Sequence, residues 1–180
     1  MSKLYVDNIN PNSSWTGEEI AGNTVSPPGA ILQVVQGEMT DIFTCDSTSF
    51  EDTGLTASIT PTSTSSKILV TVNAAVGHGG GTYTTLVRLM RDSTPVGNGV
   101  AVGSREAAMA ITGDNYAHVV EFVGTTYLDS PNTTSAINYK LQMKVQAADH
   151  PSSLNKSTGD PDAAYAGRYA SYITLMEIAG

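Results

Sequence analysis

The feature that most constrains this fold is a succession of short runs in which apolar and polar residues alternate. In residues 137–147, Ile137, Leu141 and Met143 belong to an apolar face, whereas Lys140 and Lys144 belong to a polar one. About nine strand-like runs follow one another, and no convincing helix of ordinary length separates them. We therefore exclude a parallel α/β plan and expect an all-β, antiparallel β-sandwich, most simply a jelly roll.

Turn-forming residues bound the expected strands. These strands are residues 31–36, 39–45, 53–60, 67–76, 83–91, 96–102, 117–128, 137–147 and 170–180. Residues 105–111 stay ambiguous, because their composition favours a helix while a jelly roll has a strand there. In residues 67–76 one face is apolar throughout, and Leu69 is the large apolar residue on the opposite face. Residues 149–168 are expected to form a long loop.

The chain divides at Ser26-Pro27-Pro28-Gly29 into an arm, residues 1–28, and a body, residues 29–180. The two prolines stiffen the backbone and mark the boundary. Thr16-Gly-Glu-Glu19 fits a capping box and predicts the start of a short helix. A fully extended arm would reach on the order of 90 Å, which is enough to contact a neighbouring subunit.

Composition limits the partners. The net charge is −8 and charged residues make up 14% of the chain, with Lys and Arg scattered, so binding to nucleic acid or to an anionic membrane is not expected. No apolar run is long enough to span a membrane. The N-terminus lacks the apolar region of a signal peptide, so we expect synthesis in the cytoplasm.

Four stretches of the body resemble a bacteriophage domain that occurs in tail fibres and other virion-surface proteins, particularly of marine and cyanobacterial phages. They are Gly29-Ala-Ile-Leu-Gln-Val-Val-Gln36, Asp52-Thr-Gly-Leu-Thr-Ala-Ser-Ile-Thr-Pro61, Ser65-Ser-Lys-Ile-Leu-Val70 and Ser171-Tyr-Ile-Thr-Leu-Met-Glu-Ile178. The arm run Leu4-Tyr-Val-Asp-Asn-Ile-Asn-Pro11 is similar to the virion-proximal start of many such fibres. The resemblance implies a trimeric, tumour necrosis factor-like jelly roll. No shaft separates arm from body, which suits a protein close to the particle surface.

Candidate contact residues follow from this reading. The arm would dock on capsid or tail proteins of the virion through Leu4, Tyr5, Val6, Ile9, Trp15 and Ile20, with Trp15 as an aromatic anchor. Runs 86–90 and 119–123 carry large apolar residues on both faces, which predicts either a subunit interface or packing under the 149–168 loop. The interface candidates are Tyr165, Tyr169, Tyr172, Leu86, Met90 and Phe122.

Candidate chemistry is sparse. His78-Gly-Gly-Gly81 matches an oxyanion-loop element of lipases, but no Gly-x-Ser-x-Gly elbow accompanies it, so a hairpin turn with an exposed His is expected. Cys45 is interpreted as a buried structural side chain. Asp160 and Asp162, with Asp149 and His150, offer a weak cation-site pattern that the turn at Pro161 explains equally. We expect no enzyme activity, cofactor or metal.

The sequence therefore predicts a phage virion structural protein. In the first hypothesis it is a trimeric capsid decoration or head-fibre protein on the virion surface, assembled in the host cytoplasm and docked through its arm. In the alternative it is a tail-associated fibre or receptor-binding protein that contacts a host outer-membrane protein or a surface glycan. A glycan would meet a rim formed by Tyr83, Tyr127 and the 149–168 loop.

Overall fold

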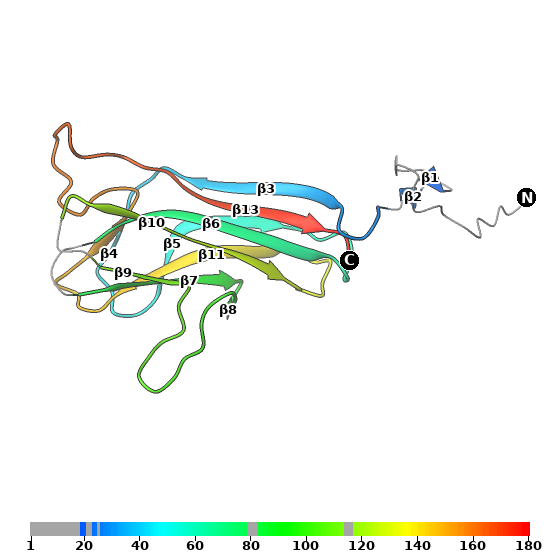
Figure 1. Cartoon of the computed structure of the whole chain (residues 1–180), viewed down its shortest axis with the longest axis horizontal. Coiled ribbons are helices and arrows are strands. Elements are labelled where there is room, and N and C mark those ends of the chain that lie inside the picture. Colours follow the sequence, from blue (N-terminus) through cyan, green and yellow to red (C-terminus); the bar gives the residue numbers. More distant parts are fainter. Residues whose placement is uncertain (1–18, 21–22, 25, 79–82, 114–116) are drawn as a thin grey trace, which may run out of the picture.

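The computed structural model describes residues 19–20, 23–24, 26–78, 83–113 and 117–180. In this part of the chain all regular structure is β, in two antiparallel sheets that face each other across one core (Figure 1). Outside the body, β1 (Glu19–Ile20) pairs with β2 (Asn23–Thr24). No helix of the described part is long and apolar enough to cross a membrane.

The first sheet has four long strands at its centre. In spatial order these are β3 (Ile31–Met39), β13 (Ser171–Ile178), β6 (Lys67–Gly77) and β10 (Val120–Asp129). Because β13 stops pairing with β6 at Asn73, the short β12 (Ser152–Leu154) continues along the same edge of β6 and pairs in turn with β4 (Phe43–Cys45). We call the four long strands the four-stranded sheet.

The opposite sheet has three long strands and two short ones. In order these are β5 (Glu51–Ile59), β11 (Ile137–Val145) and β7 (Thr85–Arg91), with β8 (Thr94–Pro95) and β9 (Ala110–Thr112) both on the far edge of β7. A register shift between Lys140 and Gln142 marks a bulge against β5.

The chain order of the strands identifies the topology. If β3, β5, β6, β7, β9, β10, β11 and β13 are numbered one to eight, the sheets read 1-8-3-6 and 2-7-4-5. Each consecutive pair crosses between the sheets or folds back within one, which is the double Greek key of a jelly roll. The all-β, antiparallel sandwich expected from the alternating pattern is confirmed.

The core consists of the side chains that the alternation along each strand places inward. Alternate residues of β11 from Ile137 to Val145 are 0–6% exposed, and the intervening Lys and Gln residues face solvent. The inner residues of β6, including Val70 and Ala74, are likewise buried. A buried aliphatic side chain contributes about 1.5–3 kcal/mol, so this double layer supplies most of the stabilisation.

A buried polar group joins the two sheets near the end of β10. Asp129 accepts two hydrogen bonds from Arg91 at 2.8 and 2.9 Å and one from the Tyr139 hydroxyl at 2.6 Å. Asp129 belongs to the four-stranded sheet, and both donors belong to the opposite sheet. Burial raises the pKa of Tyr139, as does its bond to this carboxylate, so the phenol stays a donor.

The long connection after β11 is held by Asn155, which has a φ of 67°. Its Nδ2 donates to the carbonyls of Met39 at 2.7 Å and Asp41 at 2.9 Å, and its Oδ1 accepts from Ser171 Oγ at 2.6 Å. Asn tolerates the left-handed conformation better than most residues. One side chain therefore fixes this connection to the ends of β3 and β13.

The two sides of the sandwich differ. Along β3 the sheets approach closely, because a Cβ at Gly37 would lie 2.0 Å from the Thr56 carbonyl oxygen of β5. Along β10 the inward-facing Val123, Thr125 and Tyr127 stay partly exposed, whereas their neighbours on β6 are buried. Val123 and Tyr127 still pack against the core, and a Cβ at Gly97 would lie 2.8 Å from Tyr127 Cγ. The sandwich is closed at β3 and more open at β10.

Several sequence expectations are wrong in detail. Residues 105–111, which the sequence left open between a helix and a strand, form irregular chain up to residue 109, and strand β9 begins at Ala110. Residues 96–102 form no strand because the Asn98 side chain, rather than a strand backbone, bonds the Leu89 N–H and carbonyl. The 149–168 loop contains β12, and Glu19 begins a strand rather than continuing a helical turn.

Candidate interaction surface on the four-stranded sheet

Four large apolar side chains form a row across the outer face of the four-stranded sheet. The register pairs Met176 of β13 with Val34 of β3 and with Leu69 of β6, and pairs Leu69 with Leu128 of β10. Val34 is 56% exposed and Leu128 is 48% exposed, whereas Leu69 and Met176 are partly covered. We call these four residues the apolar row. The row lies on the face of the sheet that points away from the core.

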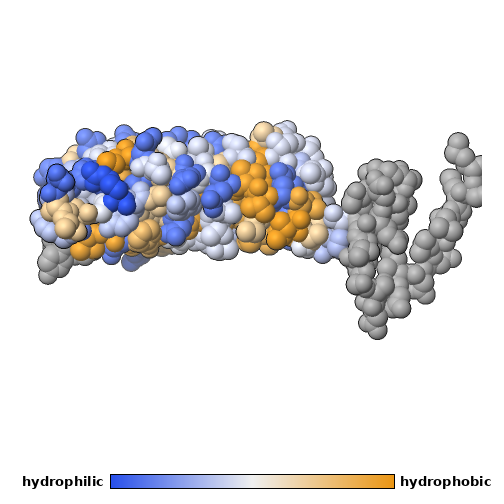
Figure 2. Space-filling view, turned by 90° about the horizontal axis from the view of Figure 1, so that it is seen from above, coloured by the Kyte–Doolittle hydropathy of each residue, from blue (hydrophilic) through white to orange (hydrophobic). Residues whose placement is uncertain are grey.

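The apolar row lies near the end of the body where the arm joins. Ile178 of β13 pairs with Ile31 of β3, which is 58% exposed, after a bulge at Glu177. Gly29 N donates to the Ala179 carbonyl and Ala179 N to the Ala30 carbonyl, both at 2.8 Å, so the chain enters the body here. Figure 2 shows hydrophobic surface gathered at this end.

The rest of this face is polar but almost uncharged. The next outward residues along the four strands, which pair with one another, are Gln36, Thr174, Thr71 and Thr126. The outward pair after these is Tyr172 and Asn73. Glu38 of β3 and Lys67 of β6 are the charged side chains that the alternation places outward on the four strands. Little charge must be desolvated when another surface covers this face.

A buried carboxylate lies under the same end. Glu177 faces inward, where it accepts hydrogen bonds from Gln33 Nε2 at 2.6 Å and from Thr62 N and Oγ1 at 2.7 Å. Burial opposes ionisation, but these donors outweigh it and lower the pKa of Glu177. The carboxylate thereby joins β3, β13 and the turn after β5 beneath the apolar row.

The outer face of the opposite sheet is charged. Asp52 accepts hydrogen bonds from Lys140 at 2.7 Å and Gln142 at 2.6 Å, and the bond from Lys140 lowers the pKa of Asp52. Beside them the Arg88 guanidinium lies 3.9 Å from the centre of the Phe50 ring. Lys144 completes the line with an ion pair to Glu106.

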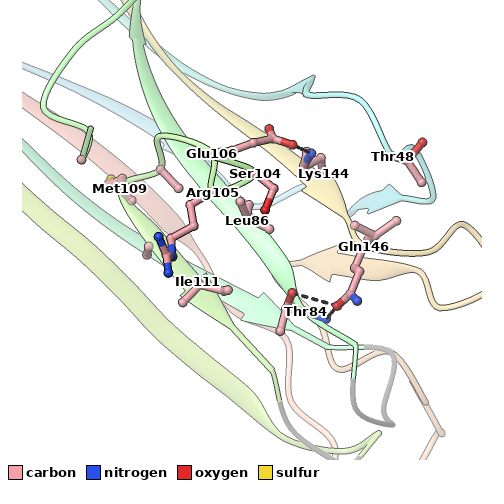
Figure 3. A pocket seen from close by; sticks show the side chains of 14 residues that line it. Thr48, Thr84, Leu86, Ser104, Arg105, Glu106, Met109, Ile111, Lys144 and Gln146 are labelled. Carbon is pink, nitrogen blue, oxygen red and sulfur yellow. Dashed lines mark hydrogen bonds and ion pairs between the residues drawn. The ribbon is translucent and has the colours of Figure 1, made fainter. Parts of the chain in front are cut away.

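A shallow hollow of about 660 Å³ lies on this charged face, under the 99–111 segment (Figure 3). Leu86, Met109 and Ile111 give it apolar walls, and the Glu106–Lys144 pair lies on one side. On the other side Gln146 Oε1 accepts from Thr84 N and Oγ1, each at 3.2 Å. The hollow is wide and carries no pair of groups arranged for acid–base or nucleophilic chemistry.

The predicted interface residues fall in three places: the four-stranded sheet, the 149–168 loop and the opposite sheet. Tyr172 lies on the outer face of the four-stranded sheet, and Phe122, on β10, contacts Tyr169 edge-on at 5.8 Å. Tyr165, in the loop, is 68% exposed. Leu86 and Met90 lie on the opposite sheet, where Leu86 lines the hollow and Met90, 4% exposed, pairs with Pro95.

The apolar row itself went unnoticed in the sequence except for Leu69. Its signal was present, because Val34, Leu69, Leu128 and Met176 each follow the outward phase of an otherwise alternating strand. Register between strands was needed to line them up. Of the predicted arm contacts, Ile20 belongs to β1, and Leu4, Tyr5, Val6, Ile9 and Trp15 lie outside the described residues.

The residues considered for catalysis or metal binding are buried or hydrogen-bonded within the body. His78 is 2% exposed, which corrects the expectation of an exposed His, and the preceding Gly77 lies against the backbone of Lys156 and Ser157. Asp160 bonds Arg168 and Lys156, and the Arg168 bond lowers the pKa of Asp160. Burial raises the pKa of the Cys45 thiol. The described residues contain no group of three metal-binding side chains.

No known protein family and no curated protein matches the sequence. Two solved structures are similar in fold. One is the T=1 particle derived from infectious bursal virus, with a TM-score of 0.43, 11% identity and coverage of 91% of this chain and 42% of that chain. The other is the T13 IBDV viral particle, with a TM-score of 0.44, 11% identity and coverage of 91% and 41%. The chain spans less than half of either neighbour, and likenesses this weak assign no function.

Proposed function

We propose that this protein is a phage virion structural protein, a trimeric capsid decoration or head-fibre protein that docks on the particle through its arm, residues 1–28. The observation that supports this proposal best is the nearly uncharged outer face of the four-stranded sheet, with the apolar row beside the start of the body. Such a face fits protein–protein assembly, whereas a solvated face normally carries the charges found on the opposite sheet.

In this proposal the outer face of the four-stranded sheet joins the subunits, with the apolar row at the end of this face beside the arm. Four strands about 4.8 Å apart and nine residues long cover on the order of 600 Å², near the roughly 800 Å² per partner of a standard interface. Tyr172 extends this contact from the apolar row toward the other end of the sheet. The three-fold follows from the resemblance to trimeric virion-surface domains.

The arm supplies attachment to the particle. It begins beside the apolar row, because Gly29 is bonded to Ala179, so the arms of a trimer would leave the assembly at one end. Leu4, Tyr5, Val6, Ile9, Trp15 and Ile20 supply apolar groups for pockets on the docking surface. The body would then face away from the particle.

Deleting residues 1–28 tests the attachment. We expect a soluble trimer that no longer co-sediments with phage particles lacking the native protein. The full-length variant Trp15→Ala should weaken binding without abolishing it, and Tyr165→Ala serves as a control outside the arm. Truncated protein that binds particles as well as the full chain would contradict the role of the arm.

Particle stability tests the decoration role. Phage that lack the protein should release DNA at a lower temperature and should adsorb to host cells normally. Adding purified full-length protein should restore the release temperature, whereas protein without residues 1–28 should not. Unchanged DNA release together with lost adsorption would contradict decoration and favour a place on the tail.

One observation favours the tail-associated alternative. Aromatic groups gather in the loops opposite the arm, where the partly exposed Tyr83 and His150 have ring centroids 3.9 Å apart and the exposed Tyr165 and His118 have ring centroids 5.3 Å apart. Aromatic rings with an open side can stack on sugars of a host surface glycan. If so, the free body would compete with phage for host cells, and Tyr165→Ala would reduce the competition. Immunogold labelling with antibody against residues 30–180 would separate head from tail.

A further inference from the structure

The body has a second surface feature that the proposed function does not use, the free backbone edge of β10. Among the described residues β10 pairs with β6 alone, through ten consecutive residue pairs without a bulge. No hydrogen bond of a described residue reaches the other backbone edge of residues 120–128. On this side the sandwich is less fully covered than at β3, because Val123, Thr125 and Tyr127 face inward and stay partly exposed, although Val123 and Tyr127 also pack against the core.

The strand lacks three of the features that normally protect an edge, namely Lys, Pro and a bulge. Monomeric β-proteins protect edge strands with Lys, Pro, a bulge or a covering loop. The sequence Val120-Glu-Phe-Val-Gly-Thr-Thr-Tyr-Leu-Asp129 has no Lys and no Pro. Its charges stand near the two ends, at Glu121 and Asp129, and Asp129 is already bound to Arg91. The middle of the edge is neutral and straight, and is therefore ready to accept another strand.

We propose that β10 pairs with β10 of a second copy, antiparallel and about a two-fold axis at Gly124. In this register Phe122 faces Thr126 of the second copy, and no charge faces a like charge. Gly124 leaves the axis without side chains. A two-fold at Thr125 would instead set Glu121 opposite Asp129, which repel each other. The pairing joins two four-stranded sheets into one continuous sheet and covers the open side of both sandwiches.

The second copy is the occupant that the sequence of the edge favours. An isologous contact needs a self-complementary surface, and β10 is neutral about its centre although the chain carries a net charge of −8. The pairing uses the backbone edge of β10, whereas the proposed three-fold uses the outer face of the sheet. It goes beyond the proposed function and does not depend on the arm. Alone it produces dimers, and combined with a three-fold it produces assemblies of six.

Charge placement across the two-fold tests the pairing and its register. The double variant F122K/T126K sets Lys opposite Lys twice in the dimer, because residue 122 of each copy faces residue 126 of the other. Both positions are solvent-exposed in one body, where they lie four residues apart on the same strand. We expect the molar mass of the full-length chain, measured by light scattering, to be an even multiple of the subunit in the wild type. It should fall by half in F122K/T126K, with self-association at least about tenfold weaker.

The variant F122K/T126E provides the matched rescue. It loses the same contact between Phe122 and Tyr169, yet it sets Lys opposite Glu, so the wild-type mass should return. T48K/S58K, which adds two positive charges at exposed positions of the loop before β5 and of β5, should leave the mass unchanged. A wild type with an odd number of subunits, or equal masses for the two β10 variants, would overturn the pairing. Particle binding by these variants reports separately on the proposed function.

Discussion

The outer faces of the two sheets are built from strands with the same alternation, yet they carry opposite chemistry. On the opposite sheet, Lys140, Asp52, Arg88, Lys144 and Glu106 are each matched by a counter-ion or an aromatic ring. On the four-stranded sheet the outward positions hold Thr, Gln, Asn and Tyr beside the apolar row. Paired charges suit permanent contact with water, whereas a neutral face with an apolar row loses little when it is covered.

The difference shows where copies of an acidic chain can meet. At a net charge of −8, two copies repel unless their contact avoids the acidic regions. The four-stranded sheet offers such a contact because Glu38 is its one outward carboxylate and Lys67 lies on the same face. The charged face would then remain exposed and keep the assembly soluble.

The largest expected effect comes from separating the two sheets on which both faces depend. Asp129→Ala removes the carboxylate that binds Arg91 and Tyr139, leaving a cation and a buried hydroxyl without their partner. Breaking such a buried pair costs about 3–5 kcal/mol. Urea denaturation should show this loss in the free energy of unfolding. A loss below about 1 kcal/mol would mean that solvent replaces the carboxylate.

Charging the apolar row comes next. V34E/L128E places carboxylates at two exposed positions on the row, so folding should be preserved while the proposed trimer dissociates. Large apolar residues that anchor an interface each contribute about 2 kcal/mol or more, so subunit affinity should fall by roughly a hundredfold or more. Sedimentation velocity measures the effect. The matched pair T56E/S58E, at exposed positions of β5, should leave the oligomer intact, and a stable trimer of V34E/L128E would contradict the proposed interface.

A smaller effect is expected beneath the apolar row, at Glu177. Because the pKa of Glu177 is lowered in the folded state, its contribution is present above the pKa of the unfolded chain and is lost as pH falls through the folded value. E177Q sets an amide donor among the donors from Gln33 and Thr62, and should cost about 1–3 kcal/mol at neutral pH. The loss should shrink below pH 4, as thermal unfolding at several pH values would show. A loss that does not change with pH would contradict the ionised state.

The sequence predicted the layers of this fold well, because burial on one face produces a period of two that a single chain displays. Residues 67–76 and 137–147 were assigned to strands with the correct inward side chains for this reason. Segments held by side chains were not predictable in the same way. The Asn98 side chain donates a hydrogen bond to the Leu89 carbonyl at the edge of β7. The Asn155 side chain donates to the Met39 carbonyl and so fixes the connection that contains β12. Neither bond leaves a periodic signal.

The candidate surface was only partly visible for a related reason. Phe122 was recognised as an excess apolar residue, but Met90, chosen on the same ground, packs within its own chain. A single strand does not tell whether its second apolar face meets another subunit or a loop of the same chain. The pairing register of β3, β13, β6 and β10 distinguishes these two cases. Only in that register do four outward side chains form a row, namely Val34, Met176, Leu69 and Leu128.

The smallest expected effect lies on the charged face and sharpens the contrast with the apolar row. The Lys140–Asp52 pair has partly exposed side chains, and pairs of this kind contribute about 0–1 kcal/mol. Asp52→Asn should therefore change the free energy of unfolding by less than about 1 kcal/mol and leave the oligomer intact, with even that change fading at high salt. Urea denaturation at low and high ionic strength, with light scattering on the same samples, would measure both. Dissociation of the oligomer by Asp52→Asn would show that the charged face, rather than the neutral one, joins the subunits.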